Sequence, residues 1–134
     1  MGPSAVPSPR VPAVGVFEHL DGIGPLPIWE GLAARAVNGE RMTMAVIELD
    51  PGAVVPEHRH ENEQLGPVLD GMLIFRVGDE TRECRPGETY RILADTPHEA
   101  TAGPEGAVVL DVFAPIRSDW AAFEPQEPST PRWP

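Results

Sequence analysis

Three histidines are the residues of this chain whose type and spacing point most directly to chemistry. His58 and His60 lie two positions apart, and His98 follows much later in the sequence. On a β-strand, side chains two positions apart point to the same face, so two imidazoles there lie near enough to share a metal ion. A third imidazole from a distant strand would complete the set. The alternative is that His58 and His60 are solvated surface residues. We interpret His19 as a surface residue too.

The composition predicts that strands position these histidines. A chain of 134 residues is long enough for one domain and its own core. It contains 17 prolines and 13 glycines, about twice the usual share of these residues. Such frequent turn-forming residues argue against a helix bundle and favour short strands joined by turns.

The clearest predicted hairpin joins residues 32–37 to residues 42–49 through Asn38-Gly39. We expect turns at Asp70-Gly71 and at residues 103–106, a bulge or an edge position at Pro67, and one helical turn over 118–123. The other expected strands cover 53–60, 65–69, 72–77, 81–85, 88–93, 98–101 and 106–113. This spacing is typical of an antiparallel sandwich or small barrel.

Proline-rich segments at both ends bound the predicted domain. Residues 1–12 and 124–134 each carry four prolines, and we interpret them as extended or disordered tails. The predicted globular domain therefore spans residues 13–123.

Charge and hydropathy argue against nucleic acid and membranes as partners. The net charge of −11 disfavours nucleic acid and anionic membranes as partners. No apolar run approaches the roughly 20 residues of a membrane helix, and residues 1–12 have no apolar core like that of a signal peptide. We therefore expect a cytoplasmic protein. Cys84, the single cysteine, is expected to be a small apolar filler, not a nucleophile.

The histidine pair belongs to a longer pattern, Gly52-x5-His58-x-His60-x3-Gln64-x6-Gly71, which resembles the first motif of the cupin family. A second motif is looser: Gly87 leads a strand and His98 stands at the last histidine position, but residues 93–95 depart from the family's Pro-x-Gly. The resemblance covers about residues 30–118. It implies an all-β, single-domain cupin, a jelly-roll barrel.

The resemblance also implies a metal site formed by His58, His60, Gln64 and His98. In the alternative interpretation, Gln64 is merely polar and the three histidines bind the metal with water. Three imidazoles and an amide are neutral, so they leave the full charge on the ion and favour Lewis-acid chemistry. Nitrogen-rich ligation suits a divalent transition metal; Zn or Ni is favoured, with Fe, Mn, Co and Cu also possible.

The segment from Asp111 to Trp120 resembles the D-V-F-x-P-x-R-x-D-[FWY] ending of small single-domain cupins, among them the KdgF-like proteins, which convert 4,5-unsaturated monouronates to linear ketonised sugars. The resemblance implies catalytic roles for Asp111, Phe113 and Arg117: a general acid/base, a pocket wall and a carboxylate clamp.

Three arginines offer a structural alternative for Asp111, namely a salt bridge to Arg35, Arg76 or Arg91. Tyr90 and Arg35 are further candidates for the barrel interior, although packing or ion pairing is the favoured interpretation for both.

Four functions follow from these observations. The first is a non-redox metal enzyme acting on a small anionic substrate such as a uronate. The others are a polyketide-cyclase-type cupin, which the low aromatic content of 6% disfavours, a quercetinase-like dioxygenase, and a non-enzymatic metal- or ligand-binding module. We also expect a homodimer, with residues 25–29 in the contact or, alternatively, Trp29 buried in its own barrel.

Overall fold

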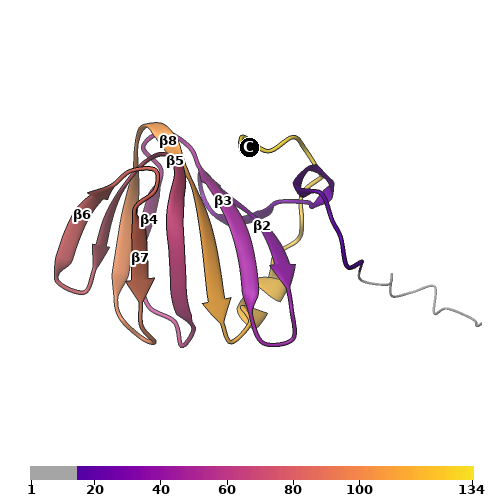
Figure 1. The fold of residues 1–134 in the computed structure, drawn as a ribbon, viewed down its shortest axis with the longest axis horizontal. Helices are drawn as coiled ribbons and strands as arrows, with labels where there is room; N and C mark the ends of the chain where they lie inside the picture. Colours follow the sequence, from indigo (N-terminus) through magenta and orange to yellow (C-terminus); the bar gives the residue numbers. More distant parts are fainter. Residues whose placement is uncertain (1–14) are drawn as a thin grey trace, which may run out of the picture.

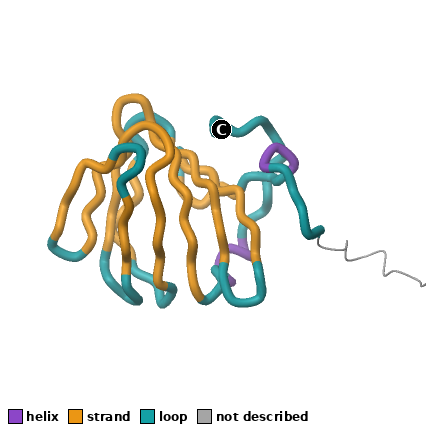
Figure 2. The backbone as a smooth tube through the Cα atoms, viewed as in Figure 1, coloured by secondary structure: helices purple, strands orange, loops and turns teal. Residues whose placement is uncertain are grey.

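The computed structural model describes residues 15–134, and the predicted tail at residues 1–12 lies outside this range. Strands dominate the chain, with two short 3-10 helices near its ends (Figure 2). The strands are β1 (Leu26–Trp29), β2 (Leu32–Asn38), β3 (Thr43–Leu49), β4 (Val54–His58), β5 (Glu63–Val77), β6 (Glu80–Cys84), β7 (Thr89–Ile92) and β8 (His98–Ala114). The helices are η1 (Leu20–Gly22) and η2 (Ser118–Ala122). Neither of them is long and apolar enough to cross a membrane.

All strand pairs are antiparallel, and two long strands organise the barrel (Figure 1). The sheet order is β1-β2-β3-β8-β5-β6, with β4 paired to β8 and β7 paired to β5. The second half of β8 pairs with β3 and with the first half of β5, whereas its first half pairs with β4 and with the second half of β5. Both long strands therefore run through the two layers of a jelly roll.

Two predicted turns are wrong, because the chain bends there without reversing. Asp70-Gly71 lies inside β5, and residues 103–106 lie inside β8. The pairing of these strands shifts register on both sides of Asp70-Gly71. Gly71 and Gly106 have φ angles of +74° and +80°, and a Cβ on Gly71 would lie 2.2 Å from the Gly106 carbonyl oxygen. The turn-forming residues thus make two bulges that pack against each other.

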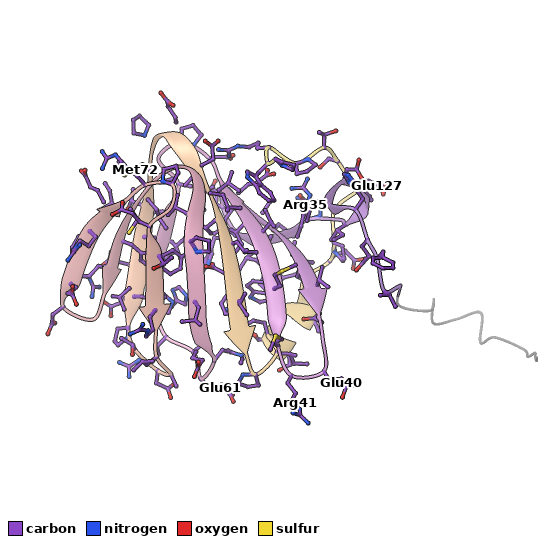
Figure 3. All side chains as sticks on the ribbon, in the orientation of Figure 1. Arg35, Glu40, Arg41, Glu61, Met72 and Glu127 are labelled. Atoms are coloured by element: carbon purple, nitrogen blue, oxygen red, sulfur yellow. The ribbon has the colours of Figure 1, made fainter. Side chains whose placement is uncertain are left out.

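Other predicted elements are confirmed. The hairpin over residues 32–49 forms from β2 and β3, closed by the loop Gly39–Met42. Glu40 and Arg41 point away from the barrel at the tip of this loop (Figure 3). The predicted helical turn is η2, and Cys84 is a buried, free thiol.

The interior of the barrel is built by alternating strand residues. In β3, Thr43, Ala45, Ile47 and Leu49 are all buried on one face, as their period of two predicts. They meet buried apolar residues of the long strands, including Val68, Leu73 and Val109. The apolar cluster surrounds, but does not fill, the space in which the predicted site lies.

The C-terminal segment, residues 124–134, runs back along the outside of β2 and β3 (Figure 1). Arg35 donates to the backbone and hydroxyl oxygens of Ser129 at 3.1 and 2.9 Å. Arg132 donates its backbone N–H to Glu48 at 2.7 Å and its guanidinium to the Leu49 carbonyl at 3.0 Å. Of the two predicted states, extended and disordered, the segment is extended and bound to the barrel.

Candidate metal centre and active site

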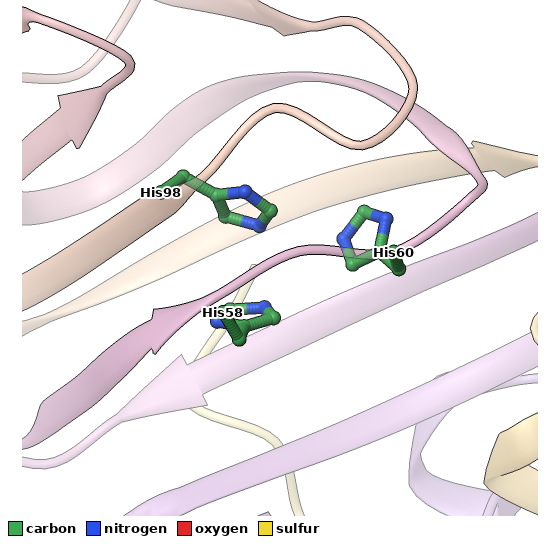
Figure 4. Close-up of side chains that lie close together, drawn as sticks. All are labelled: His58, His60 and His98. Atoms are coloured by element: carbon green, nitrogen blue, oxygen red, sulfur yellow. The ribbon is translucent and has the colours of Figure 1, made fainter.

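The three predicted histidines converge at one end of the barrel (Figure 4). His58 ends β4, His60 follows in the next loop, and His98 begins β8 directly opposite His58 in the strand register. One ring nitrogen of each histidine can be chosen so that all three lie within 4.8 Å of one another. The interpretation as two unconnected surface histidines is therefore wrong.

The backbone fixes the tautomer of each ring in the same way. Every Nδ1 lies within hydrogen-bond distance of a carbonyl two residues away in the sequence. These carbonyls belong to Pro56, Asn62 and Thr96, at 2.9, 2.8 and 2.8 Å from His58, His60 and His98. Because a carbonyl can only accept, each Nδ1 carries the hydrogen, which leaves the lone pair of a neutral ring on Nε2, as in ligands oriented by an outer shell of hydrogen bonds.

The protonation equilibria keep two of these rings neutral. Burial lowers the pKa of His98 to about 4. Burial, followed by the charge of Arg117, also lowers the pKa of His60. The Nε2 atom of His98 is fully buried and has no hydrogen-bond partner among the described residues. A buried lone pair without a donor fits a site built for a metal ion.

Gln64 lies beside the histidines and is buried, whereas the adjacent Glu63 is exposed, as the strand alternation predicts. The carboxamide oxygen of Gln64 is 3.2 Å from Nε2 of His60. Since Nδ1 of His60 carries the hydrogen, these two atoms face each other as lone pairs. A cation between them would relieve that repulsion, so Gln64 fits the role of a fourth ligand.

Asp111 is buried next to Gln64 without a salt bridge to any described residue. Tyr90 donates its hydroxyl to Oδ1 of Asp111 at 2.5 Å. Burial raises the pKa of Asp111 to about 6, although the Tyr90 hydroxyl, the Gln64 amide and the nearby Arg117 oppose that shift. Burial and Asp111 together raise the pKa of Tyr90 well above its usual value.

The three arginines named as salt-bridge partners for Asp111 lie elsewhere. Arg35 pairs with Glu48, and Arg76 pairs with Glu57 and Glu99. Arg91 is exposed and has no ion pair among residues 15–134. The salt-bridge interpretation of Asp111 is therefore wrong.

Arg117 is held rigidly beside the cavity by aromatic rings and by a carboxylate. Its guanidinium lies 4.7 Å from the ring centre of Phe113 and 4.6 Å from that of Trp120. Nε and Nη2 donate to the two carboxylate oxygens of Asp119 at 3.1 and 2.9 Å, which lowers the pKa of Asp119. None of the described hydrogen bonds uses Nη1, so a further anion has one free edge to bind.

These groups line a cavity of about 370 Å³. Six of the eight aromatic residues in the chain contribute to its wall, together with aliphatic side chains and the polar groups of the site; they are Trp29, Phe75, Tyr90, Phe113, Trp120 and Phe123. Low aromatic content was therefore a poor guide to the pocket. Trp29 itself is half-buried in its own barrel, 5.6 Å from the His58 ring.

One positioning residue was undervalued from the sequence, and a second was not identified. Tyr90, a candidate for the barrel interior for which packing was favoured, lines the cavity and donates its hydroxyl to Asp111. Asn62 accepts from His60 through its carbonyl and donates from its side chain to the Pro115 and Ile116 carbonyls at 2.6 and 3.2 Å. It thus ties the histidine loop to the segment that carries Arg117. No local spacing marks either role, since Asp111, Pro115 and Ile116 all lie far away in the sequence.

A small antiparallel barrel with histidine and amide donors facing one interior point defines a class of metal-binding jelly rolls. A model of the cupin domain matches residues 45–113, and the chain belongs to the cupin family.

Three known proteins show how far the likeness extends. The pectin degradation protein KdgF of Dickeya dadantii is 26% identical over 93 residues, which cover 68% of this chain and 84% of that protein. The structure of KdgF from Halomonas sp. is 26% identical with a TM-score of 0.73, covering 79% of this chain and 98% of the other. A 1-deoxy-D-xylulose-5-phosphate synthase of Citrobacter koseri is 33% identical over 112 residues, but the match covers only 17% of that enzyme.

Proposed function

We propose that this protein is a metal-dependent cupin enzyme that acts by non-redox chemistry on a small carboxylated sugar acid, as its likeness to pectin degradation proteins suggests. The substrate class is a 4,5-unsaturated monouronate, converted to its linear ketonised form. The observation that carries the proposal is the convergence of three histidine rings in a cavity that also contains Asp111 and Arg117.

His58, His60, Gln64 and His98 would hold the ion. A divalent transition metal bound there, Zn or Ni by preference, supplies Lewis-acid polarisation of a substrate oxygen, undiminished by any charged ligand.

The remaining groups bind and orient the substrate. Arg117 offers its free Nη1 edge to the substrate carboxylate, and the two aromatic rings and Asp119 hold the guanidinium in place. Asp111 holds or moves a proton at its carboxylate, since a pKa of about 6 suits both directions of transfer near neutral pH. Phe113 forms the adjacent wall of the cavity.

The test begins with metal content, measured by mass spectrometry on protein purified without an affinity tag. We expect about one equivalent of a transition metal per chain. The loaded protein is then given a 4,5-unsaturated monouronate, and loss of the ultraviolet absorbance of the conjugated double bond reports ketonisation. Failure to retain metal after reconstitution would overturn the proposal. Full turnover by the metal-loaded Asp111→Asn variant would show that Asp111 does not transfer a proton in the reaction.

The aromatic cavity wall favours a second candidate, a cyclase-type cupin acting on a flat polyketide-like substrate. Six aromatic side chains around one cavity offer more apolar surface than a sugar acid requires. Binding of a planar aromatic acid, with no absorbance change on the unsaturated uronate, would favour this candidate. Oxygen consumption in either assay would point to a dioxygenase instead. Homodimer formation remains a prediction.

A further inference from the structure

The side chain of Gln64 lies between two groups: a metal site would need an acceptor atom from it, and a carboxylate would need a donor. On one side is Nε2 of His60, at 3.2 Å from the Gln64 carboxamide oxygen. On the other side is the Asp111 carboxylate, which the strand register places on the same face of the sheet. Because the carboxamide oxygen lies toward His60, the amide nitrogen is the polar atom of Gln64 that is left to face Asp111.

The strand register brings these two residues together. Gln64 of β5 pairs with Phe113 of β8, and Asp111 lies two residues before Phe113, on the same face of the sheet. Gly66 leaves room for this approach, because a Cβ there would lie 2.6 Å from Oδ1 of Asp111 and 2.2 Å from the Leu110 carbonyl oxygen. The backbone therefore places the two side chains next to each other.

The hydrogen-bond inventory allows one orientation of the Gln64 amide. An ionised Asp111 can only accept, and its Oδ1 already receives the Tyr90 hydroxyl. Turning the Gln64 amide over would place its oxygen against the carboxylate, acceptor against acceptor. The amide nitrogen thus stays on Asp111, and the oxygen stays on the side of the histidines.

We propose that Asp111 positions Gln64 as a metal ligand, and that an amide is required at position 64 because it alone offers an oxygen to the metal and an N–H group to Asp111. A glutamate there would supply the oxygen but would set two carboxylates against each other. This inference rests on the proposed metal site and gives Asp111 a role in addition to proton transfer.

A charge swap tests the pairing. The variants are Gln64→Glu, Asp111→Asn and the double variant, which keeps the total charge of the pair and restores one N–H donor between the two side chains. The readout is the affinity of each apo protein for Ni²⁺ alone, measured by competition with a chromophoric chelator. Thermal unfolding of the apo proteins is the second readout, and neither depends on turnover.

We expect Gln64→Glu and Asp111→Asn each to weaken Ni²⁺ binding by about tenfold or more, the usual effect of losing the outer support of a ligand. The double variant should bind within about threefold of the wild type, which means strong coupling between the two positions. If Gln64→Glu changes affinity by the same factor in the wild-type protein and in the Asp111→Asn variant, the proposal is wrong.

Two further outcomes keep the test decisive. If Gln64→Glu does not fold but the double variant folds and binds Ni²⁺, the rescue supports the proposal. If neither protein that carries the Gln64→Glu substitution folds, wild-type affinity in Asp111→Asn alone overturns it. Failure of the wild-type protein to bind any transition metal would instead overturn the proposed function, so the two failures are distinguishable.

Discussion

The two faces of the sheet at β2, β3 and β8 each bury a charged side chain, and they treat it differently. On the outer face, Arg35 is 2% exposed and pairs with Glu48 at 2.9 Å, with Ser129 supplying two further acceptors. On the inner face, Asp111 is 4% exposed and accepts from the uncharged Tyr90 hydroxyl, with Gln64 beside it on the same face.

Burial of a charge is costly unless an opposite charge compensates it. The outer arginine is compensated, and its hydrogen bonds attach the C-terminal segment to the barrel. The inner carboxylate is not neutralised by a direct partner, and its pKa rises to about 6. We infer that the outer cluster serves stability, whereas the inner cluster keeps a reactive group at a cost in stability.

The largest expected effect comes from removing a ligand on the inner side. His98→Ala removes the buried Nε2 that lacks a partner, so Ni²⁺ or Zn²⁺ affinity should fall by more than about 100-fold, beyond the cost of an outer-shell change. Turnover on the unsaturated uronate should fall to background. His19→Ala is the matched control, because His19 is exposed and far from the cavity. Equal metal content in the two variants would refute the assignment.

Removing one carboxylate charge from each face tests the comparison directly. Glu48→Gln leaves Arg35 buried beside an uncharged amide, so the free energy of unfolding should fall by about 2–4 kcal/mol, near the range for breaking a buried pair. Turnover per folded molecule should not change, because Glu48 does not line the cavity.

Asp111→Asn should lower turnover and leave stability almost unchanged, the opposite of Glu48→Gln. Turnover at saturating metal should drop by about 10²–10⁴-fold, the usual contribution of a general acid or base. The free energy of unfolding should change by less than about 1 kcal/mol, since Tyr90 can still donate to the amide oxygen. Urea denaturation and initial rates measure both quantities. A large loss of stability in Asp111→Asn would mean that the Asp111 carboxylate also stabilises the fold.

The histidine end of the site was predictable because its signal is local. His58 and His60 lie only two residues apart, at the end of β4 and in the loop that follows it, and their rings converge. The spacing of the cupin motif adds Gln64 and His98. Tyr90 was undervalued because its partner, Asp111, comes from a different strand. A hydroxyl-to-carboxylate contact between β7 and β8 leaves no spacing pattern in the sequence.

The fold was predictable where apolar and polar residues alternate, as in β3. It was not predictable where a glycine could form either a hairpin turn or a bulge. Asp70-Gly71 and the segment ending at Gly106 carry the signal of a turn, yet both bend a continuous strand. A glycine with positive φ suits a bulge and a hairpin equally. The choice between them depends on the packing of Gly71 against Gly106, which only the assembled barrel defines.

A smaller effect is expected from truncating the chain after Pro128. The truncated protein loses the acceptors of Ser129 and the hydrogen bonds of Arg132, but it retains the Arg35–Glu48 pair. We expect a loss of about 2 kcal/mol in the free energy of unfolding, the sum of a few hydrogen bonds to partly exposed groups. Chemical denaturation measures this, and metal affinity is the control. An unchanged midpoint would mean that the segment contributes nothing to stability.

The smallest effects come from deleting one hydroxyl on each face. Ser129→Ala removes an acceptor from Arg35 and should cost about 0.5–1 kcal/mol of stability with turnover unchanged.

Tyr90→Phe removes the donor to Asp111 but keeps the edge contact with the Phe75 ring, so packing is preserved. Its turnover number should fall several-fold at constant KM, because the carboxylate loses the hydroxyl that orients it. In the Asp111→Asn background the same substitution should change turnover little, since the group it positions is already gone. An equal loss in both backgrounds, together with a lower unfolding midpoint, would place Tyr90 with the structural residues of the outer face.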